Sequence, residues 1–156
     1  MEQIKLDAAS SRILRELQRD SRQTVQELSA KVGLSVSPCW RRVKELEASG
    51  VVRRYTALVE REKVGLSACI LAQVSRLRQT EGAAEQFESA MHACAEVIEC
   101  YSVTGDADYV IKVVLPDVKA YDAFLHRVMF KIKDIGTLRS IVVLRDEQGE
   151  IRAFYN

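Results

Sequence analysis

The chain has 156 residues, of which 47% are hydrophobic and 29% charged, a balance that excludes intrinsic disorder and suffices for one large or two small domains. Its net charge of +1 is uneven, because residues 1–65 hold 13 basic against 9 acidic residues and residues 66–156 hold 10 against 13. We expect the two parts to bind different partners. No apolar stretch is long enough to cross a membrane and the N-terminus lacks secretion-signal features, which predicts a cytoplasmic protein with no membrane partner.

Cysteine and histidine residues are too scattered to predict a metal site. No Cys-x-x-Cys pair occurs, and both histidines stand alone in helical patterns. We predict free thiols in a reducing compartment, no metal and no cofactor. The residues concerned are Cys39, Cys69, Cys94, Cys100, His92 and His126.

Helical patterns and capping residues fill the chain before residue 51. Asp7 suits the N-cap of a first helix, and Thr24 with Glu27 predicts a capping box for a second, which Gly33 ends. Ser35 is the expected N-cap of a third helix. Helical spacing directs these apolar side chains toward a shared core: Ile13, Leu14, Leu17, Val25, Leu28, Val32, Val36, Trp40, Val43 and Leu46.

The third predicted helix has a basic face opposite its apolar face. The basic face comprises Ser37, Arg41 and Lys44, with Arg42 nearby. After Gly50, residues 51–56 are β-prone and carry Arg53 and Arg54, which predicts a strand or wing. The order helix, turn, basic helix, basic strand is typical of a winged helix-turn-helix.

This arrangement suits duplex DNA for a physical reason. A helix fits the major groove, short polar residues at its start approach phosphates or base edges, and arginine or lysine neutralises phosphates or reads guanine. The predicted DNA-binding residues are Ser35, Ser37, Arg41, Arg42, Lys44, Arg53 and Arg54. The alternative is a merely solvated helix, since Glu45 and Glu47 dilute the positive charge.

The pattern changes at the charged segment 58–65, which ends in glycine and predicts a linker between domains 1–57 and 66–156. Helices are predicted after Thr80 and after Asp117. Strands are predicted at 67–74, 97–104, 109–115 and 137–144. The order β-α-β-β-α-β predicts a ferredoxin-like domain with two helices on one face of an antiparallel sheet, so the fold class of the chain is α+β.

The other face of this sheet also carries apolar residues. Ile98, Cys100, Val110 and Val114 supply apolar or small side chains to both faces, which would expose apolar surface in a monomer. Packing two sheets together in a symmetric homodimer removes this exposure. Such a dimer can hold two recognition helices one helical turn apart, roughly 34–36 Å, to read a palindrome.

The hairpin connection 105–108 is a candidate ligand site. Gly105 permits close approach, exposed turn N–H groups can hold a carboxylate, and Asp106 or Asp108 can hold an ammonium. These two anchors suit a free amino acid. The alternative is an ordinary Gly-Asp-x-Asp turn whose aspartates bind nearby backbone.

In this order, the motifs resemble the Lrp/AsnC family of feast/famine transcription regulators over about residues 6 to 145. In the first half they are Leu6-Asp7, Ile13-Leu14, Glu27-Leu28, Val32-Gly33-Leu34-Ser35, Ser37-Pro38-Cys39, Arg42-Val43, Leu46-Glu47, Gly50-Val51-Val52 and Tyr55-Thr56-Ala57. In the second half they are Val97, Glu99-Cys100, Val103-Thr104-Gly105-Asp106, Asp108-Tyr109 and Pro116-Asp117. The position of Trp40 varies in the family, which favours a packing role for this residue.

The resemblance implies a DNA-binding domain followed by a ligand-binding and oligomerisation domain, in dimers that often assemble into octamers on the bacterial or archaeal nucleoid. It also implies an amino-acid effector bound between subunits near the turn, which favours the ligand-site interpretation. The implied ligand-binding residues are Tyr101, Thr104, Gly105, Asp106, Asp108 and, from the facing strand, Ser140.

Three functions are consistent with these patterns. The first is a sequence-specific regulator whose assembly or DNA affinity responds to an amino acid, and the second is a DNA organiser that needs no effector. The third is an enzyme, because some haem-pathway decarboxylases resemble this family. Those enzymes need positioned histidines, whereas His92 and His126 are far from the turn in sequence. We therefore expect no enzymatic activity.

Overall fold

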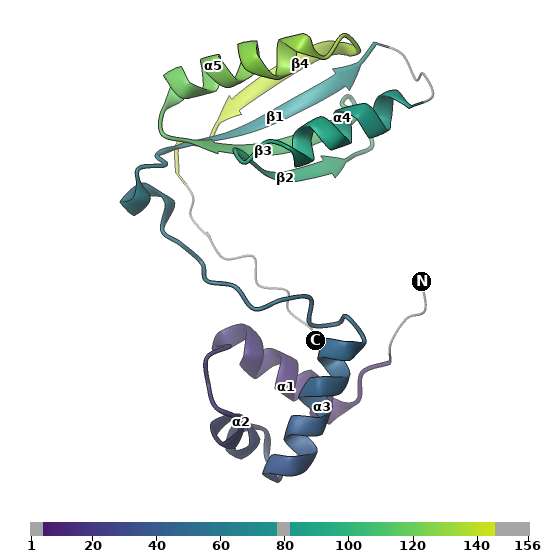
Figure 1. Ribbon diagram of the computed structural model, residues 1–156, viewed down its shortest axis with the longest axis vertical. Helices are drawn as coiled ribbons and strands as arrows, with labels where there is room; N and C mark the ends of the chain where they lie inside the picture. Colours follow the sequence, from purple (N-terminus) through teal and green to yellow (C-terminus); the bar gives the residue numbers. More distant parts are fainter. Residues whose placement is uncertain (1–4, 78–81, 146–156) are drawn as a thin grey trace. The chain divides into compact units, whose positions relative to one another are not determined.

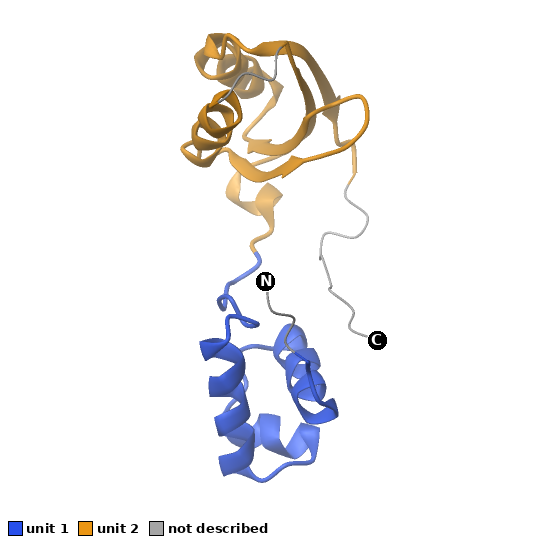
Figure 2. Ribbon diagram, turned by 90° about the vertical axis from the view of Figure 1, so that its right-hand side faces the viewer, with its two compact units in different colours: residues 1–58, 148–156 blue, residues 59–147 orange. Residues whose placement is uncertain are grey.

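The computed structural model describes residues 5–77 and 82–145, which form two compact units that part between Leu58 and Val59 (Figures 1 and 2). Each unit has a hydrophobic core of its own. The segment 58–65, predicted as a linker, contains a short 3₁₀ helix, η1 (Arg61–Val64). No helix among the described residues is both long and apolar enough to span a membrane.

The first unit is a three-helix bundle whose helices begin and end where local signals place them. They are α1 (Ala8–Arg19), α2 (Val25–Val32) and α3 (Val36–Ala48). The Ser10 N–H donates to the Asp7 carboxylate at 2.7 Å, and Thr24 and Glu27 form the predicted capping box. Gly33 ends α2 in the left-handed conformation, at φ +68°, which confirms the predicted turn.

The core of this unit confirms most of the predicted apolar positions, but not Val36 and Trp40. These two side chains are 41% and 54% exposed. Cys39 faces the core in their place, together with Val43 and Leu46, which were predicted to do so. Successive residues of an α-helix are rotated by about 100° about the helix axis. Trp40 therefore points well to one side of the core-facing stripe that starts at Cys39. The buried residues are Ile13, Leu14, Leu28, Ser29, Val32, Cys39 and Leu46.

The segment after α3 differs from its prediction, because residues 51–58 form no strand. Val51 and Val52 pack against the core, and the Val52 N–H donates to the Leu46 carbonyl at 3.0 Å. A strand needs a partner for its backbone groups, and the described part of this unit contains only helices. Ser35 does stand at the N-cap of α3, but its side chain makes no capping hydrogen bond.

The second unit confirms the predicted βαββαβ order and its ferredoxin-like arrangement. Its antiparallel sheet has the strand order β2-β3-β1-β4, and both helices lie on the same face (Figures 1 and 2). The elements are β1 (Ala68–Arg76), α4 (Ala83–His92), β2 (Val97–Ser102), β3 (Tyr109–Leu115), α5 (Val118–Arg127), η2 (Met129–Lys131) and β4 (Ile135–Val142).

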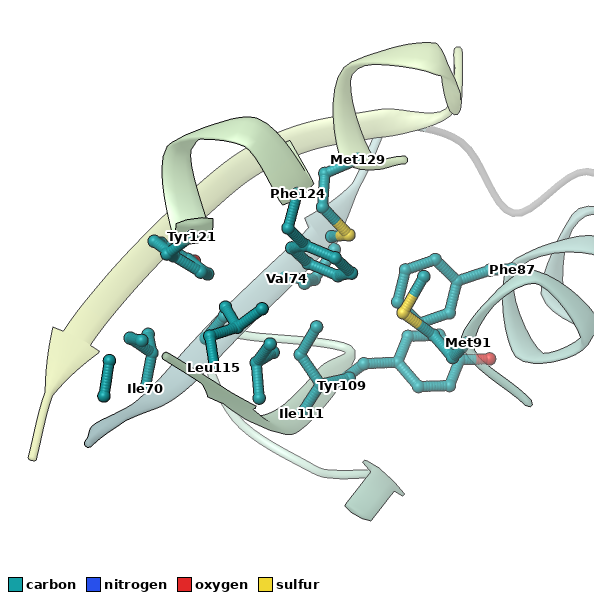
Figure 3. Packing of buried hydrophobic residues seen from close by; sticks show 13 residues of the cluster. Ile70, Val74, Phe87, Met91, Tyr109, Ile111, Leu115, Tyr121, Phe124 and Met129 are labelled. Atoms are coloured by element: carbon teal, nitrogen blue, oxygen red, sulfur yellow. The ribbon is translucent and has the colours of Figure 1, made fainter. Parts of the chain in front are cut away.

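Large side chains from both helices and the central strands form the core of the second unit (Figure 3). Phe87 of α4 packs on Tyr109 of β3, with 4.5 Å between ring centroids. Phe124 of α5 is 1% exposed, and the Asp117 carboxylate caps this helix as predicted, accepting the Ala120 N–H at 2.7 Å. The core therefore fixes the helix-facing side of β1 and β3 and directs alternate residues to the outer face.

Two connections in this unit differ from their predictions. Gly82, not Thr80, is the N-cap of α4, and Thr80 itself lies outside the described residues. The hairpin connection spans residues 103–108 instead of 105–108. Within it, the Asp108 carbonyl accepts the Val103 N–H and the Asp108 N–H donates to the Val74 carbonyl of β1, both at 2.9 Å.

Candidate DNA interface and ligand site

The predicted basic face of α3 is exposed and is formed by Ser37, Arg41 and Lys44. Arg41 lies 3.7 Å from Glu45, and the Lys44 ammonium lies 2.7 Å from the Glu47 carboxylate. Exposed pairs of this kind contribute about 0–1 kcal/mol, so a DNA phosphate can replace the carboxylate. The helix therefore presents two exposed cations, each beside a carboxylate of α3 that a phosphate can replace.

Arg42 differs from its neighbours because it joins two helices of the bundle. Its guanidinium donates to the Asp7 carboxylate at 2.6 Å and to the Ser10 hydroxyl at 3.2 Å. The side chain is only 27% exposed. The N–H and hydroxyl of Ser10, together with Arg42, lower the pKa of Asp7 from its ordinary value of 3.8 to about 2. Arg42 thus holds α3 against the start of α1.

This link predicts a specific pH dependence of stability. Because the pKa of Asp7 is lower in the folded state, its contribution is fully present above pH 3.8 and is lost as the pH falls toward 2. Asp7→Asn retains an N-cap but removes the charge that faces Arg42. In urea unfolding of the first unit at about pH 6, we expect this variant to reach its midpoint at a lower urea concentration than the wild type. On acidification to about pH 3, the midpoint of the variant should fall less than that of the wild type.

A matched control for this prediction is Asp117→Asn, which changes the N-cap of α5 in the second unit. No arginine pairs with Asp117 among the described residues. This variant should retain the wild-type loss of first-unit stability on acidification. If Asp7→Asn lost as much stability on acidification as the wild type, the pair of Asp7 with Arg42 would contribute nothing to stability.

Beyond α3, the sequence did not reveal that Tyr55 is tied to the helix. The Tyr55 hydroxyl donates to Glu47 at 2.9 Å, so one carboxylate holds both Tyr55 and Lys44. Burial of its hydroxyl, together with the bond to Glu47, raises the pKa of Tyr55 to about 12. Arg53 and Arg54 are exposed in the same segment, and Ser35 is exposed before α3.

The predicted ligand turn is held against the end of β1. The Arg76 N–H donates to the Asp108 carboxylate at 2.6 Å, and the Ser75 hydroxyl donates to the Asp106 carbonyl at 2.8 Å. Asp108 is therefore a structural residue of this turn. The Asp106 carboxylate accepts no hydrogen bond from any residue that the structure describes, and it is exposed together with Thr104 and Gly105.

The backbone N–H groups of residues 104–107 donate no hydrogen bond to another described residue. Gly105, at φ +116°, allows the chain to turn there. Free N–H groups beside a free carboxylate offer one anchor for an anion and one for a cation. This combination is what the two charged ends of an amino acid require.

Two other predicted ligand-binding residues lie on opposite faces of the sheet. Tyr101 points to the outer face, since it pairs with Val110, and its hydroxyl donates to Glu99 at 2.9 Å. Ser140 points to the helix face, where its hydroxyl lies 2.7 Å from the Tyr121 hydroxyl. One chain therefore does not bring Ser140 together with the turn.

The second unit has other polar features besides this turn. A hollow of about 550 Å³ is lined by Ala83, Gln86 and residues 131–134, none of which was predicted. His92 and His126 are exposed at the ends of α4 and α5. No cluster of metal-ligating side chains occurs among residues 5–77 and 82–145.

Comparisons with known proteins agree with both parts of this description. The family model described as winged helix-turn-helix DNA-binding matches residues 6–53, and the Lrp/AsnC ligand binding domain matches residues 69–149. The leucine-responsive regulatory proteins of Klebsiella pneumoniae and Escherichia coli K12 are each 36% identical over 141 residues, which cover 90% of this chain and 86% of those proteins.

Solved structures give the same result for the fold. A transcriptional regulator of Neisseria meningitidis in complex with L-methionine is 35% identical, with a TM-score of 0.87 over 92% of this chain and 93% of that one. An AsnC family transcriptional regulator of Agrobacterium tumefaciens is also 35% identical, with a TM-score of 0.89 over 94% and 95%.

A helix-turn-helix with a cationic helix, followed by a separate ligand-binding domain, defines a DNA-binding transcription regulator. The chain belongs to the Lrp/AsnC family of such regulators.

Proposed function

We propose that this protein is a sequence-specific transcription regulator whose DNA affinity or assembly is changed by a bound amino acid. The observation that carries the DNA part is the exposed basic face of α3 in a chain of this family. The ligand part draws on the free N–H groups of residues 104–107 and on the complex of the related Neisseria regulator with L-methionine. Such a regulator acts in the cytoplasm, on the nucleoid.

In this proposal the DNA contacts divide by residue type. Arg41 and Lys44 bind phosphates or guanine edges in the groove, and Arg53 and Arg54 bind flanking phosphates. Ser35 and Ser37 contribute short polar groups at the start of α3. Arg42, which was predicted among these residues, contributes indirectly by holding α3 in place.

The effector is proposed to bind with its carboxylate on the turn N–H groups and its ammonium at Asp106. A ligand changes DNA binding only if its affinity differs between the DNA-competent and incompetent assemblies, and a difference of about 1–3 kcal/mol suffices. A site between subunits makes such a difference easy to obtain. Tyr101 and Thr104 are the proposed walls, whereas Ser140 points to the helix face, away from the outer face through which the dimer is proposed to form.

A symmetric homodimer, which can assemble further into an octamer, is proposed to form through the outer face of the sheet. Leu71 and Ile141 lie side by side on this face, as do Val110 and Tyr101. Ile141 is 43% and Tyr101 51% exposed, so both offer apolar surface to a partner. Lys112 and Glu99 pair at 3.5 Å between these two groups, which leaves the face mixed and not wholly apolar.

Calorimetric titration of the full chain with L-methionine and, singly, the other standard amino acids tests the ligand part. Binding of at least one amino acid, with a change in DNA affinity of about 5- to 150-fold, is the expected result. If none binds while DNA binding persists, the chain is an effector-independent DNA organiser, the alternative that the exposed basic face alone would support.

Asp106→Ala should abolish the effector response and leave basal DNA binding unchanged. The reason is that the Asp106 carboxylate is exposed and holds no other described residue, so its loss removes an ammonium anchor without disturbing the fold. Fluorescence anisotropy with a labelled duplex, with and without the effector found by calorimetry, measures the response.

Asp108→Asn is the matched comparison, because the Asp108 carboxylate accepts the Arg76 N–H and stabilises the turn. We expect this variant to lower the thermal stability of the second unit, which Asp106→Ala should not do. A full effector response in Asp106→Ala would remove this residue from the site.

A further inference from the structure

An apolar line runs along α3 at the border of its basic face. It consists of Val36 and Trp40, which lie one helical turn apart, and we refer to it as the Trp40 strip. Trp40 is 54% and Val36 41% exposed, and the Lys44 ammonium lies 6.0 Å from the centroid of the indole ring. Trp40 is the single tryptophan of the chain.

This exposure is unusual for the largest apolar side chain. Tryptophan is highly buried on average, and exposed apolar patches rimmed by polar groups mark binding surfaces. The helix could bury its apolar side chains against the bundle, but Cys39, Val43 and Leu46 occupy that face. The indole is instead presented on the same side of α3 as Lys44.

Charge determines which partner suits the strip. Arg41 and Lys44 are exposed beside it, and the α3 N-terminus carries the short polar residues Ser35 and Ser37. These groups favour a polyanion over an apolar protein surface or a membrane interior. Within the major groove of DNA, the C5-methyl group of thymine is the apolar feature that a side chain can contact.

We propose that Trp40, supported by Val36, reads thymine methyl groups in the major groove. This inference rests on the proposed function. Arg41 and Lys44 supply affinity through phosphates, which carry no sequence information, whereas the Trp40 strip supplies selectivity through base edges. Removing Trp40 should therefore change which sequence is bound and leave the salt dependence unchanged.

The test starts from duplexes enriched from a random-sequence pool by the full chain. Thymines of the enriched duplex are then replaced one at a time by deoxyuridine, which removes only the methyl group. For the wild type, at least one replacement should weaken binding about fourfold, the effect of burying one methyl group. For Trp40→Ala this penalty should vanish, and Trp40→Phe should retain part of it.

Tryptophan emission gives an independent readout, because Trp40 is the only source. The enriched duplex should shift or quench this emission, and a duplex of unrelated sequence should change it less. Phe130→Ala is the matched control, because it removes an aromatic side chain that is 61% exposed in the second unit. This variant should show the same change in Trp40 emission as the wild type. Circular dichroism of Trp40→Ala should match the wild type, because the side chain is not part of the core.

The outcomes separate the two proposals. If Trp40→Ala enriches the same sequence and keeps the deoxyuridine penalty, the inference about Trp40 is overturned while DNA binding stands. If the tryptophan emission changes with protein concentration but not with DNA, the Trp40 strip contacts another protein chain, and the inference is likewise overturned. If the wild type enriches no duplex, the proposed function itself fails.

Discussion

Replacing both Arg41 and Lys44 by alanine should weaken DNA binding about 30-fold at about 0.15 M salt and make it less dependent on salt. Each phosphate contact contributes about 0.9 to the slope of log affinity against log salt, so two lost contacts lower the slope by about 1.8. The exposed positions of both side chains make this loss independent of folding. Anisotropy titrations with an enriched duplex over a range of salt concentrations measure the slope.

Two controls give this experiment its specificity. Lys119→Ala with Lys131→Ala removes the same charge from exposed positions of the second unit and should leave the slope unchanged. Glu45→Gln removes the carboxylate that lies 3.7 Å from Arg41 and should tighten binding. If the slope stays at the wild-type value in the double variant of α3, these side chains do not contact phosphate.

Leu71→Asp should dissociate the dimer that is proposed to form through the outer face of the sheet. Leu71 points to the outer face on a central strand of the sheet, beside Ile141 of β4. In a symmetric dimer both copies carry the new carboxylate, and an unpaired buried charge costs about 3–5 kcal/mol. The dissociation constant should therefore rise at least about 100-fold, as measured by light scattering against concentration.

Ile141→Asp tests the same face at a position that is already 43% exposed, where the fold tolerates the change more easily. Val118→Asp is the control, since Val118 is 57% exposed on α5 and lies away from the outer face. Dimers that persist in both Leu71→Asp and Ile141→Asp, with wild-type circular dichroism, would place the subunit contact on another surface.

Most of the fold could be predicted because its signals are local. Asp7, Thr24 with Glu27, and Asp117 start helices through contacts within three residues, and these contacts are present. The strand after α3 could not be predicted correctly, because β-propensity does not reveal whether a partner strand exists. Likewise, the N-cap at Gly82 carries no side-chain signal.

The sites were harder to predict because they depend on contacts between distant residues. Arg42 was predicted to bind DNA from its charge and its place on the helix, whereas its pairing with Asp7, 35 positions away, could not be predicted from local sequence. Trp40 was assigned to the core from its apolar character, although its spacing of four from Lys44 points to the basic side. The face on which Ser140 lies follows from the pairing of β4 with β1, which no local pattern specifies.

Dimethyl sulfate probing of an enriched duplex tests most directly whether α3 lies in the major groove, because this reagent methylates guanine N7 there. We expect two protected patches about one helical turn, roughly 34–36 Å, apart, one for each copy of a dimer. At a protein concentration that just saturates the duplex with wild type, both should disappear when Arg41 and Lys44 are replaced by alanine, because binding is then about 30-fold weaker. Guanines that remain reactive when the wild type is bound, or protection that persists in the double variant, would contradict the account.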